Sequence, residues 1–312
     1  PSRNGGKIRR MTMTVMQTGT RISAWIIADV MVIARVFPRR TQATPDDPLS
    51  FVGVETPPLL TLPEIDEVHV SVAFTYDRSR AEKMAYQWEA VGVPVRLGGP
   101  AYDDPAGEFV PGLYLKRGYT ITSRGCNNKC WFCMASKREG QLRELEIKDG
   151  WDILDNNLLQ CSEAHIRSVF EMLHRQSHRP KFTGGLEAKE LKPWHCELLR
   201  EARPERMYFA YDTPDDYEPL VMAGRMLMEA GITPQSHVMA CYNLIGYKGD
   251  TLEKANTRLN QTIKAGFMPY AMLYRDEKGK VDREWAKFQR EWLRPAIVST
   301  KFGEVWSQCK NH

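Results

Sequence analysis

The sequence predicts an α/β fold in two parts: a small Rossmann-like α/β domain, followed by a partial (β/α)6 barrel of parallel strands. Two observations lead to this prediction. Short apolar runs typical of buried strands alternate with amphipathic runs of helical period along most of the chain. The connections between these runs are short, and a strand, helix, strand order with short connections is typical of parallel β-α-β units.

The first part begins with an apolar run at residues 30–37, which we interpret as a buried strand ended by Pro38. Residues 38–66 are rich in Pro, Thr and Asp without a sustained period, so we expect a loop region there. A strand at 69–75, a helix at 78–90 and a strand at 94–97 then form one β-α-β unit. We therefore assign residues 30–105 to the Rossmann-like domain.

The second part contains six strand-like runs, at residues 119–123, 152–159, 181–183, 207–211, 237–245 and 269–274. Helical runs lie between them and after the last, at residues 162–176, 194–202, 219–230, 252–265 and 285–293, with Ser162 as an N-cap. Six such repeats predict the partial barrel, which we place at residues 106–296. We expect residues 1–29 to be a poorly ordered extension and residues 297–312 to be a C-terminal tail.

The composition is that of an ordinary globular protein, because 42% of the 312 residues are apolar and 26% are charged. A net charge of +4 permits an anionic substrate such as a nucleotide or RNA without arguing for one. The apolar stretch at residues 22–37 is too short for a spanning helix and is interrupted by Asp29 and Arg35. Seven cysteines are an odd and sparse set, which favours a cytoplasmic metal-binding protein over a disulfide framework.

Three of these cysteines, Cys126, Cys130 and Cys133, follow the first strand of the second part in a C-x3-C-x2-C pattern. Three thiolates on one short loop can hold three irons of a [4Fe-4S] cluster and leave the fourth iron open. An open, redox-active iron is a site where a small molecule can chelate and receive an electron. The spacing therefore predicts an iron-sulfur site with a vacant coordination position.

Zinc is the alternative metal, and it requires four nitrogen or sulfur ligands. The closest candidates for a fourth ligand are Cys161 and His165, about thirty residues along the chain. A second C-x2-C pair is absent from the sequence. The pattern therefore favours iron and sulfide over zinc.

The cysteine pattern, with the aromatic Phe132 just before the third cysteine, resembles the radical S-adenosylmethionine superfamily. The resemblance covers residues 119–293 and implies a [4Fe-4S] cluster, S-adenosyl-L-methionine and an external electron donor such as flavodoxin or ferredoxin. It implies reductive cleavage of S-adenosylmethionine to a 5′-deoxyadenosyl radical that abstracts hydrogen from a substrate. The first domain is similar to that of the cobalamin-binding branch but lacks the Asp-x-His-x-x-Gly signature.

Two polar clusters compete to bind the ammonium group of S-adenosylmethionine. Asp155, Asn156 and Asn157 end the second predicted strand, where the family's element usually lies. Gly184, Gly185 and Glu187 end the third, and resemble the family's Gly-Gly-Glu element with one residue inserted. An Asx turn and a helix N-terminus are the structural alternatives for the two clusters.

Later strands supply further candidates. Asp212 ends the fourth strand, where the family places a ribose-binding residue, although it is equally suited to cap the following helix. Leu244 and Ile245 lie in a segment that resembles the family's adenine-packing region, and we expect adenine contacts through their backbones. Asp250 or Thr251 is expected to cap the next helix.

These residues together predict a radical S-adenosylmethionine enzyme. A noncatalytic iron-sulfur redox sensor or electron carrier is the alternative, and a zinc-binding RNA-interaction module is a third. The absence of a Gly-rich phosphate loop and of an aromatic-basic stripe argues against the third interpretation.

Overall fold

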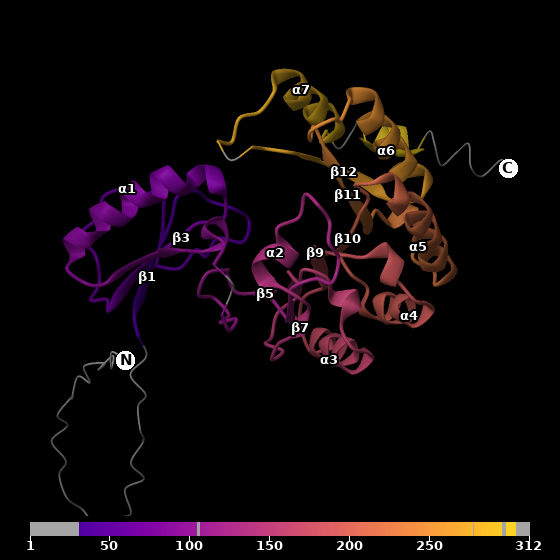
Figure 1. Ribbon diagram of the computed structural model, residues 1–312. Helices are drawn as coiled ribbons and strands as arrows, with labels where there is room; N and C mark the ends of the chain where they lie inside the picture. The colour runs from indigo at the N-terminus through magenta and orange to yellow at the C-terminus, as the bar shows by residue number, and fades with distance from the viewer. Residues whose placement is uncertain (1–30, 105–106, 277, 295–297, 304–312) are drawn as a thin grey trace, which may run out of the picture.

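The structure is a computed structural model that describes residues 31–104, 107–276, 278–294 and 298–303 (Figure 1). The predicted extension at residues 1–29 and the last nine residues of the predicted tail lie outside the described residues. The described chain forms one four-stranded and one six-stranded parallel sheet, and a short antiparallel pair. In this part of the chain no helix combines the length and the apolar character that crossing a membrane requires.

The four-stranded sheet has the order β2-β1-β3-β4, and all of its pairings are parallel. Its strands are β1 (Ile33–Phe37), β2 (Ser50–Val52), β3 (Glu67–Ser71) and β4 (Val95–Gly98). Helix α1 (Arg78–Trp88) connects β3 to β4, and its buried Met84 and Trp88 belong to the same hydrophobic cluster as Val36, Val68 and Val70. The predicted β-α-β unit is confirmed.

The prediction of residues 38–66 as loop was wrong at β2. This strand has only three half-buried residues, Ser50–Val52, and it pairs with the edge of β1. So short a segment carries no detectable period of its own, and its pairing partner alone makes it a strand.

The six-stranded sheet has the order β12-β11-β10-β9-β8-β5, so its strands lie side by side in chain order. The strands are β5 (Tyr119–Thr120), β8 (Asp152–Ile153), β9 (Lys181–Leu186), β10 (Arg206–Ala210), β11 (Met239–Ile245) and β12 (Met268–Leu273). All five pairings are parallel, which confirms the predicted α/β alternation.

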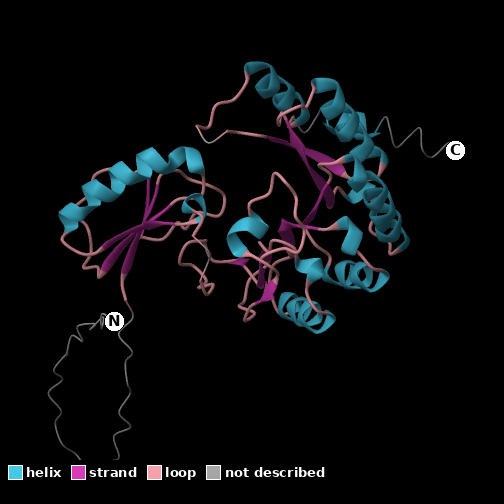
Figure 2. Cartoon of the chain, in the orientation of Figure 1, coloured by secondary structure: helices cyan, strands magenta, loops and turns pink. Residues whose placement is uncertain are grey.

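Helices connect these strands, and right-handed crossovers between strands in chain order place them all on one face of the sheet. They are α3 (Glu163–His174), α4 (Pro193–Ala202), α5 (Tyr217–Glu229) and α6 (Leu252–Lys264), with α7 (Arg283–Trp292) after β12. Figures 1 and 2 show α3 to α6 following one another along one side of the strands. Ser162 is the N-cap of α3, as predicted, and accepts a hydrogen bond from the His165 amide at 3.2 Å.

Side chains alternate between the two faces of this sheet, as strand geometry requires. Met207 and Phe209 of β10 and Cys241 of β11 are fully buried in the cluster that includes residues of α3, α4 and α5. Tyr208 and Tyr242, the intervening residues, lie on the opposite face and are only partly buried. The helix-covered face therefore carries the core, and the other face remains accessible.

The first strands of this sheet differ from the prediction. The run at 119–123 splits into β5 and into β6 (Ser123–Arg124), and β6 pairs antiparallel with β7 (Arg143–Glu144) instead. The run at 152–159 is a strand only at β8, and a 3-10 turn at Leu158–Gln160 follows. Strand β9, by contrast, continues past residue 183 to Leu186.

A buried polar contact explains the shortened strands. The Asp155 carboxylate lies behind the end of β5 and accepts hydrogen bonds from Thr122 and Ser123, which turns both segments out of the sheet. Such side-chain bonds compete with the ladder bonds that would otherwise continue a strand.

Candidate functional site

The three cysteines of the motif lie on the loop between β6 and the short helix α2 (Ala135–Glu139). All three are free thiols; Cys130 is exposed, and Cys126 and Cys133 are partly buried. The Cys126 amide donates to Gly140 O at 3.3 Å, and the Cys133 amide donates to Cys130 O at 3.1 Å. The first bond therefore joins the two ends of the loop, and the second forms a turn between Cys130 and Cys133.

Gly125 makes this closure possible. Its φ is +81°, and a Cβ atom built there would lie 2.2 Å from Gln141 O, closer than any side chain tolerates. Only glycine therefore allows the chain entering the cysteine loop to pass against the chain that leaves it.

The segment after β8 anchors the cysteine loop. The buried Asp155 carboxylate accepts from the Thr122 amide and hydroxyl, both at 2.6 Å, and from the Ser123 hydroxyl at 2.8 Å. Asn156 Oδ1 accepts from the Gly125 amide at 3.1 Å. Asp155 and Asn156 are therefore engaged in holding the first strand and the start of the loop.

Two further side chains of this segment reach the loop itself. Gln160 accepts from the Asn127 amide and donates to Asn128 Oδ1, both at 3.0 Å. Asn157 Nδ2 lies 3.7 Å from Cys126 Sγ, while its buried Oδ1 has no hydrogen-bond partner in the described chain. The loop conformation is therefore specified by side chains before any ligand binds.

N–H groups surround two of the sulfurs. The Asn128 amide lies 3.4 Å from Cys126 Sγ, and the Ala135 amide lies 3.4 Å from Cys133 Sγ. Donors directed at sulfur stabilise thiolate character and tune iron-sulfur clusters. One backbone N–H group therefore faces each of these two sulfurs.

Carboxylates lie on the other side of the loop. Partial burial raises the pKa of the Cys130 thiol, and the neighbouring Cys133, Glu187, Cys126 and Asp216 raise it further. Glu187 follows β9 and accepts from Asn128 Nδ2 at 2.6 Å. Its own pKa is raised by burial. The structure therefore brings Glu187 close to the thiols.

Gly184 and Gly185 lie inside β9 and not after it as predicted. A Cβ atom at Gly184 would lie 2.2 Å from Asp155 O, so this glycine lets β9 approach the anchoring segment. The two competing clusters are thus in contact, and each has a different role in the packing. The alternative of a helix N-terminus at 184–187 is realised only as the 3-10 turn Ala188–Glu190.

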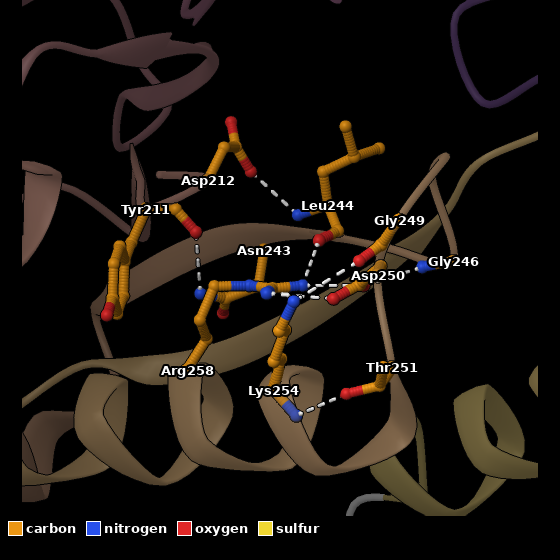
Figure 3. A network of polar contacts seen from close by, with 10 residues as sticks. All are labelled: Tyr211, Asp212, Asn243, Leu244, Gly246, Gly249, Asp250, Thr251, Lys254 and Arg258. Atoms are coloured by element: carbon orange, nitrogen blue, oxygen red, sulfur yellow. Dashed lines mark hydrogen bonds and ion pairs between the residues drawn. The ribbon is translucent and has the colours of Figure 1, made fainter. Parts of the chain in front are cut away.

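Asp212, after β10, is joined to β11 in the network of Figure 3. Its Oδ1 accepts from the Leu244 amide at 2.7 Å. Burial raises the pKa of Asp212 to about 6, Asp216 adds to this effect, and the bond from Leu244 opposes it. The predicted alternative of a helix cap is not realised, because Thr213 and Asp216 form the capping box of the following turn.

The loop after β11 is fixed by a buried ion pair. Arg258 of α6 donates to both Asp250 oxygens, at 3.0 and 2.8 Å, and to Leu244 O at 2.9 Å (Figure 3). Of the two predicted caps of α6, Asp250 and Thr251, Thr251 is the N-cap. Leu244 therefore has both backbone groups engaged by the protein, and Ile245 O accepts from the Tyr274 amide at 2.9 Å.

Phe132 and its neighbour connect the cysteine loop to this same region. The Trp131 ring lies edge-on to Phe132, with centroids 5.4 Å apart, and its centroid is 5.5 Å from that of Tyr247. Tyr247 was not predicted as a site residue. Its ring marks where the loop after β11 meets the cysteine loop.

A second group missed in the sequence is a tyrosine cluster on the accessible face of the sheet. The Tyr208 and Tyr242 rings stack at 4.3 Å, and Tyr270 lies edge-on to both at 6.1 and 5.6 Å. The Tyr242 hydroxyl donates to Thr183 O at 3.1 Å. The period-2 alternation of each strand could have assigned all three to this face.

The proposed fourth zinc ligands point elsewhere. Cys161 is buried beside Ser123, and His165 lies 3.8 Å from Glu144. In the described ranges, no group of three or more His, Cys, Asp or Glu side chains is gathered around one point as a single metal ion would require.

Comparison of the chain with protein-family models and with curated proteins gives no match. The assignment of function therefore depends on the site itself.

Proposed function

We propose that this protein is a radical S-adenosylmethionine enzyme. The observation that carries the proposal is a loop bearing three free thiols, Cys126, Cys130 and Cys133, which follows β6 beyond the carboxyl end of β5 in the parallel sheet. The other cysteines of the described chain, Cys161, Cys196 and Cys241, are buried in the core. Three sulfur donors without a fourth suit a [4Fe-4S] cluster with one open iron.

The donor set fits this cluster in two respects. Cys130 is exposed and Cys126 and Cys133 are partly exposed, and one backbone N–H group lies 3.4 Å from each of Cys126 Sγ and Cys133 Sγ. When bound and reduced, the cluster supplies one electron to the sulfonium of S-adenosylmethionine, whose cleavage gives methionine and a 5′-deoxyadenosyl radical. The protein's own task is to bind the nucleotide, orient it and exclude water.

Glu187 is the residue that we assign to the ammonium group. Asp155 is excluded because its carboxylate is fully buried and already accepts three hydrogen bonds. Glu187 has only Asn128 as a side-chain donor and lies beside the thiols. Of the two predicted clusters we therefore favour the second, and we assign Asn156 and Asn157 to the support of the cysteine loop.

Asp212 is assigned to the ribose hydroxyls. Its Oδ1 is held by Leu244 and its Oδ2 remains available as an acceptor. The adenine then lies against Leu244 and Ile245, where the Asp250–Arg258 ion pair holds the backbone rigid. Because Leu244 already uses its amide and carbonyl within the protein, we assign this contact to packing against the strand as well as to the backbone.

The six strands in chain order correspond to the (β/α)6 partial barrel of residues 106–296 that we propose as the catalytic core. The accessible face with Tyr208, Tyr242 and Tyr270 then forms its inner wall. Packed aromatic rings exclude water, and this protects a radical from solvent.

The experiment that tests the proposal is anaerobic reconstitution of the full chain with iron and sulfide, followed by addition of S-adenosylmethionine and a reductant, either dithionite or flavodoxin. We expect 5′-deoxyadenosine and methionine in the wild type. Replacement of any motif cysteine by Ala should abolish both the cluster absorbance and these products. The control is Cys196→Ala, which removes a buried thiol of α4 outside the loop and should retain both.

Two outcomes would contradict the proposal. A fully loaded cluster that neither binds nor cleaves S-adenosylmethionine indicates an iron-sulfur electron carrier or sensor. Zinc without iron or sulfide in the purified protein indicates a structural metal site.

A further inference from the structure

A cavity of about 660 Å³ lies at the carboxyl edge of the four-stranded sheet, and its other wall includes Arg124 and Glu139, which flank the cysteine loop. Phe37, Ser71 and Gly98 line it, and they are the last residues of β1, β3 and β4. In the order β2-β1-β3-β4 the chain leaves β1 on one side for β2 and returns on the other for β3. Open parallel sheets bind their ligands in the crevice that forms at such a switch point.

The arginines that line the cavity are paired with carboxylates except for one. Arg39 binds Asp77 at 2.6 Å, and Arg96 binds Glu67 at 2.7 Å. Arg124, which lines the opposite wall, has a buried Nε without a hydrogen-bond partner in the described chain, and the carboxylates of Glu139 and Asp155 act on its charge only through space. Arg124 therefore offers a guanidinium to an anion.

The neighbouring charged groups do not neutralise Arg124. Glu139 lines the same cavity, but Arg138 at 2.9 Å and Arg143 at 3.2 Å already bind its carboxylate. The start of α1, where a doubly wound fold often binds phosphate, is occupied by the ion pair of Asp77 and Arg39, so no unpaired cation is left there for an anion. An anionic group is thus directed to Arg124 and away from the helix.

Two aromatic rings on the cavity wall are held in place with part of their surface exposed. Phe74 is 37% exposed and stacks on Tyr76, with centroids 5.2 Å apart. Tyr114 is 40% exposed and stacks on His69 at 5.9 Å. Rings fixed in this way provide a platform on which a flat heterocycle stacks.

Asp104 adds an acceptor at the rim. Its Oδ2 accepts from the Gly99 amide at 3.1 Å, which fixes the carboxylate, and the exposed side chain retains its other oxygen. An acidic residue at the end of a strand in such sheets is suited to bind the hydroxyls of a ribose.

From these groups we propose that the cavity binds a nucleoside monophosphate, with the phosphate on Arg124, the ribose at Asp104 and the base against Phe74. The volume lies within the range of about 300–1,000 Å³ that small-molecule sites occupy. The site is formed by residues other than those assigned to S-adenosylmethionine, so it stands or fails independently of the proposed function.

Calorimetric titration of the full chain with adenosine 5′-monophosphate, and in parallel with adenosine, tests the phosphate contact. We expect the monophosphate to bind at least about tenfold more tightly than adenosine, because a charge-assisted hydrogen bond contributes on that order. Arg124→Met should remove this difference while leaving adenosine affinity unchanged. Arg225→Met, on the exposed face of α5, is the matched control and should behave as the wild type.

A second variant and a competition assay locate the ligand. Phe74→Ala removes a partly exposed ring and should weaken both ligands. Saturating S-adenosylmethionine should leave the affinity for the monophosphate unchanged. Equal binding of monophosphate and adenosine by the wild type, retention of the difference in Arg124→Met, or displacement by S-adenosylmethionine would each overturn the proposal.

Discussion

The buried carboxylate of Asp212 predicts a measurable dependence of stability on pH. Burial raises its pKa from 3.8 to about 6 in the folded protein. Between these values the unfolded chain has lost the proton that the folded chain still holds, so the free energy of unfolding falls as pH rises from about 4 to about 6. Each pH unit between the two values is worth about 1.4 kcal/mol, which gives a loss of about 3 kcal/mol.

The variant Asp212→Asn isolates this contribution. The amide oxygen can still accept from the Leu244 amide, the bond that measures 2.7 Å in the structure, but the side chain no longer ionises. We therefore expect the variant to match the wild type at about pH 4 and to be more stable by about 3 kcal/mol at about pH 7.5. Urea unfolding of the full chain without added cofactor, followed by circular dichroism across this range, measures the difference.

Asp216→Asn is a control, because the pKa of Asp216 is shifted in the opposite direction to that of Asp212. Although burial alone raises the pKa of Asp216, hydrogen bonds from Lys189 and Thr213 lower it below 3.8 overall. Its contribution to stability is present at neutral pH and is lost as pH falls through the lowered value. A difference between Asp212→Asn and wild type that does not change with pH, or a variant that is less stable at neutral pH, would refute the reasoning.

Three further substitutions test the packing that positions the site, each by chemical unfolding. Gly184→Ala should destabilise the fold by about 2 kcal/mol or more, because its Cβ would lie 2.2 Å from Asp155 O. Arg258→Met should cost about 3–5 kcal/mol, since it leaves the fully buried Asp250 carboxylate without its cation. Ser162→Ala should cost only about 1 kcal/mol, the usual value of an N-cap, and a loss as large as that of Arg258→Met would contradict this ranking.

The order of strands and helices was predictable because each element has its own repeating pattern of apolar and polar residues. The helix-facing residues Met207, Phe209 and Cys241 alternate with partly exposed neighbours, and this pattern marks a strand whatever surrounds it. Strand ends were less predictable, because they depend on distant partners. Asp155 ends two strands at once through Thr122 and Ser123, which lie more than thirty positions away.

The candidate site shows the same division. The cysteine spacing, the nearby Glu187 and the conformation at Thr251 could be read locally, since each depends on a few adjacent residues. The roles of Asp155 and Arg124 could not, because burial and the absence of a nearby partner are properties of the folded chain. An acidic residue after a strand has the same appearance in the sequence whether it faces a ligand or the back of another strand.

The difference between Asp155 and Glu187 leads to a prediction that separates support from recognition. Both are acidic residues beside the cysteine loop, but Asp155 is buried under three donors and Glu187 keeps acceptor capacity next to the thiols. Asp155→Asn should therefore lower the stability of the apoprotein by about 1–3 kcal/mol and reduce iron loading. The NH2 group of the new side chain would face the N–H and hydroxyl donors of Thr122 and Ser123, where the carboxylate accepts hydrogen bonds.

Glu187→Gln should keep both the stability and the cluster absorbance, and should weaken S-adenosylmethionine binding by about tenfold or more, since a neutral amide attracts an ammonium less strongly. Calorimetric titration of the two reconstituted variants, combined with iron analysis, measures both effects. The reverse result, in which Asp155→Asn loads fully but fails to bind and Glu187→Gln fails to load, would assign recognition to the segment after β8. The division of roles proposed for the two clusters would then be exchanged, because recognition requires a carboxylate that still has acceptor capacity for the ammonium group of the ligand.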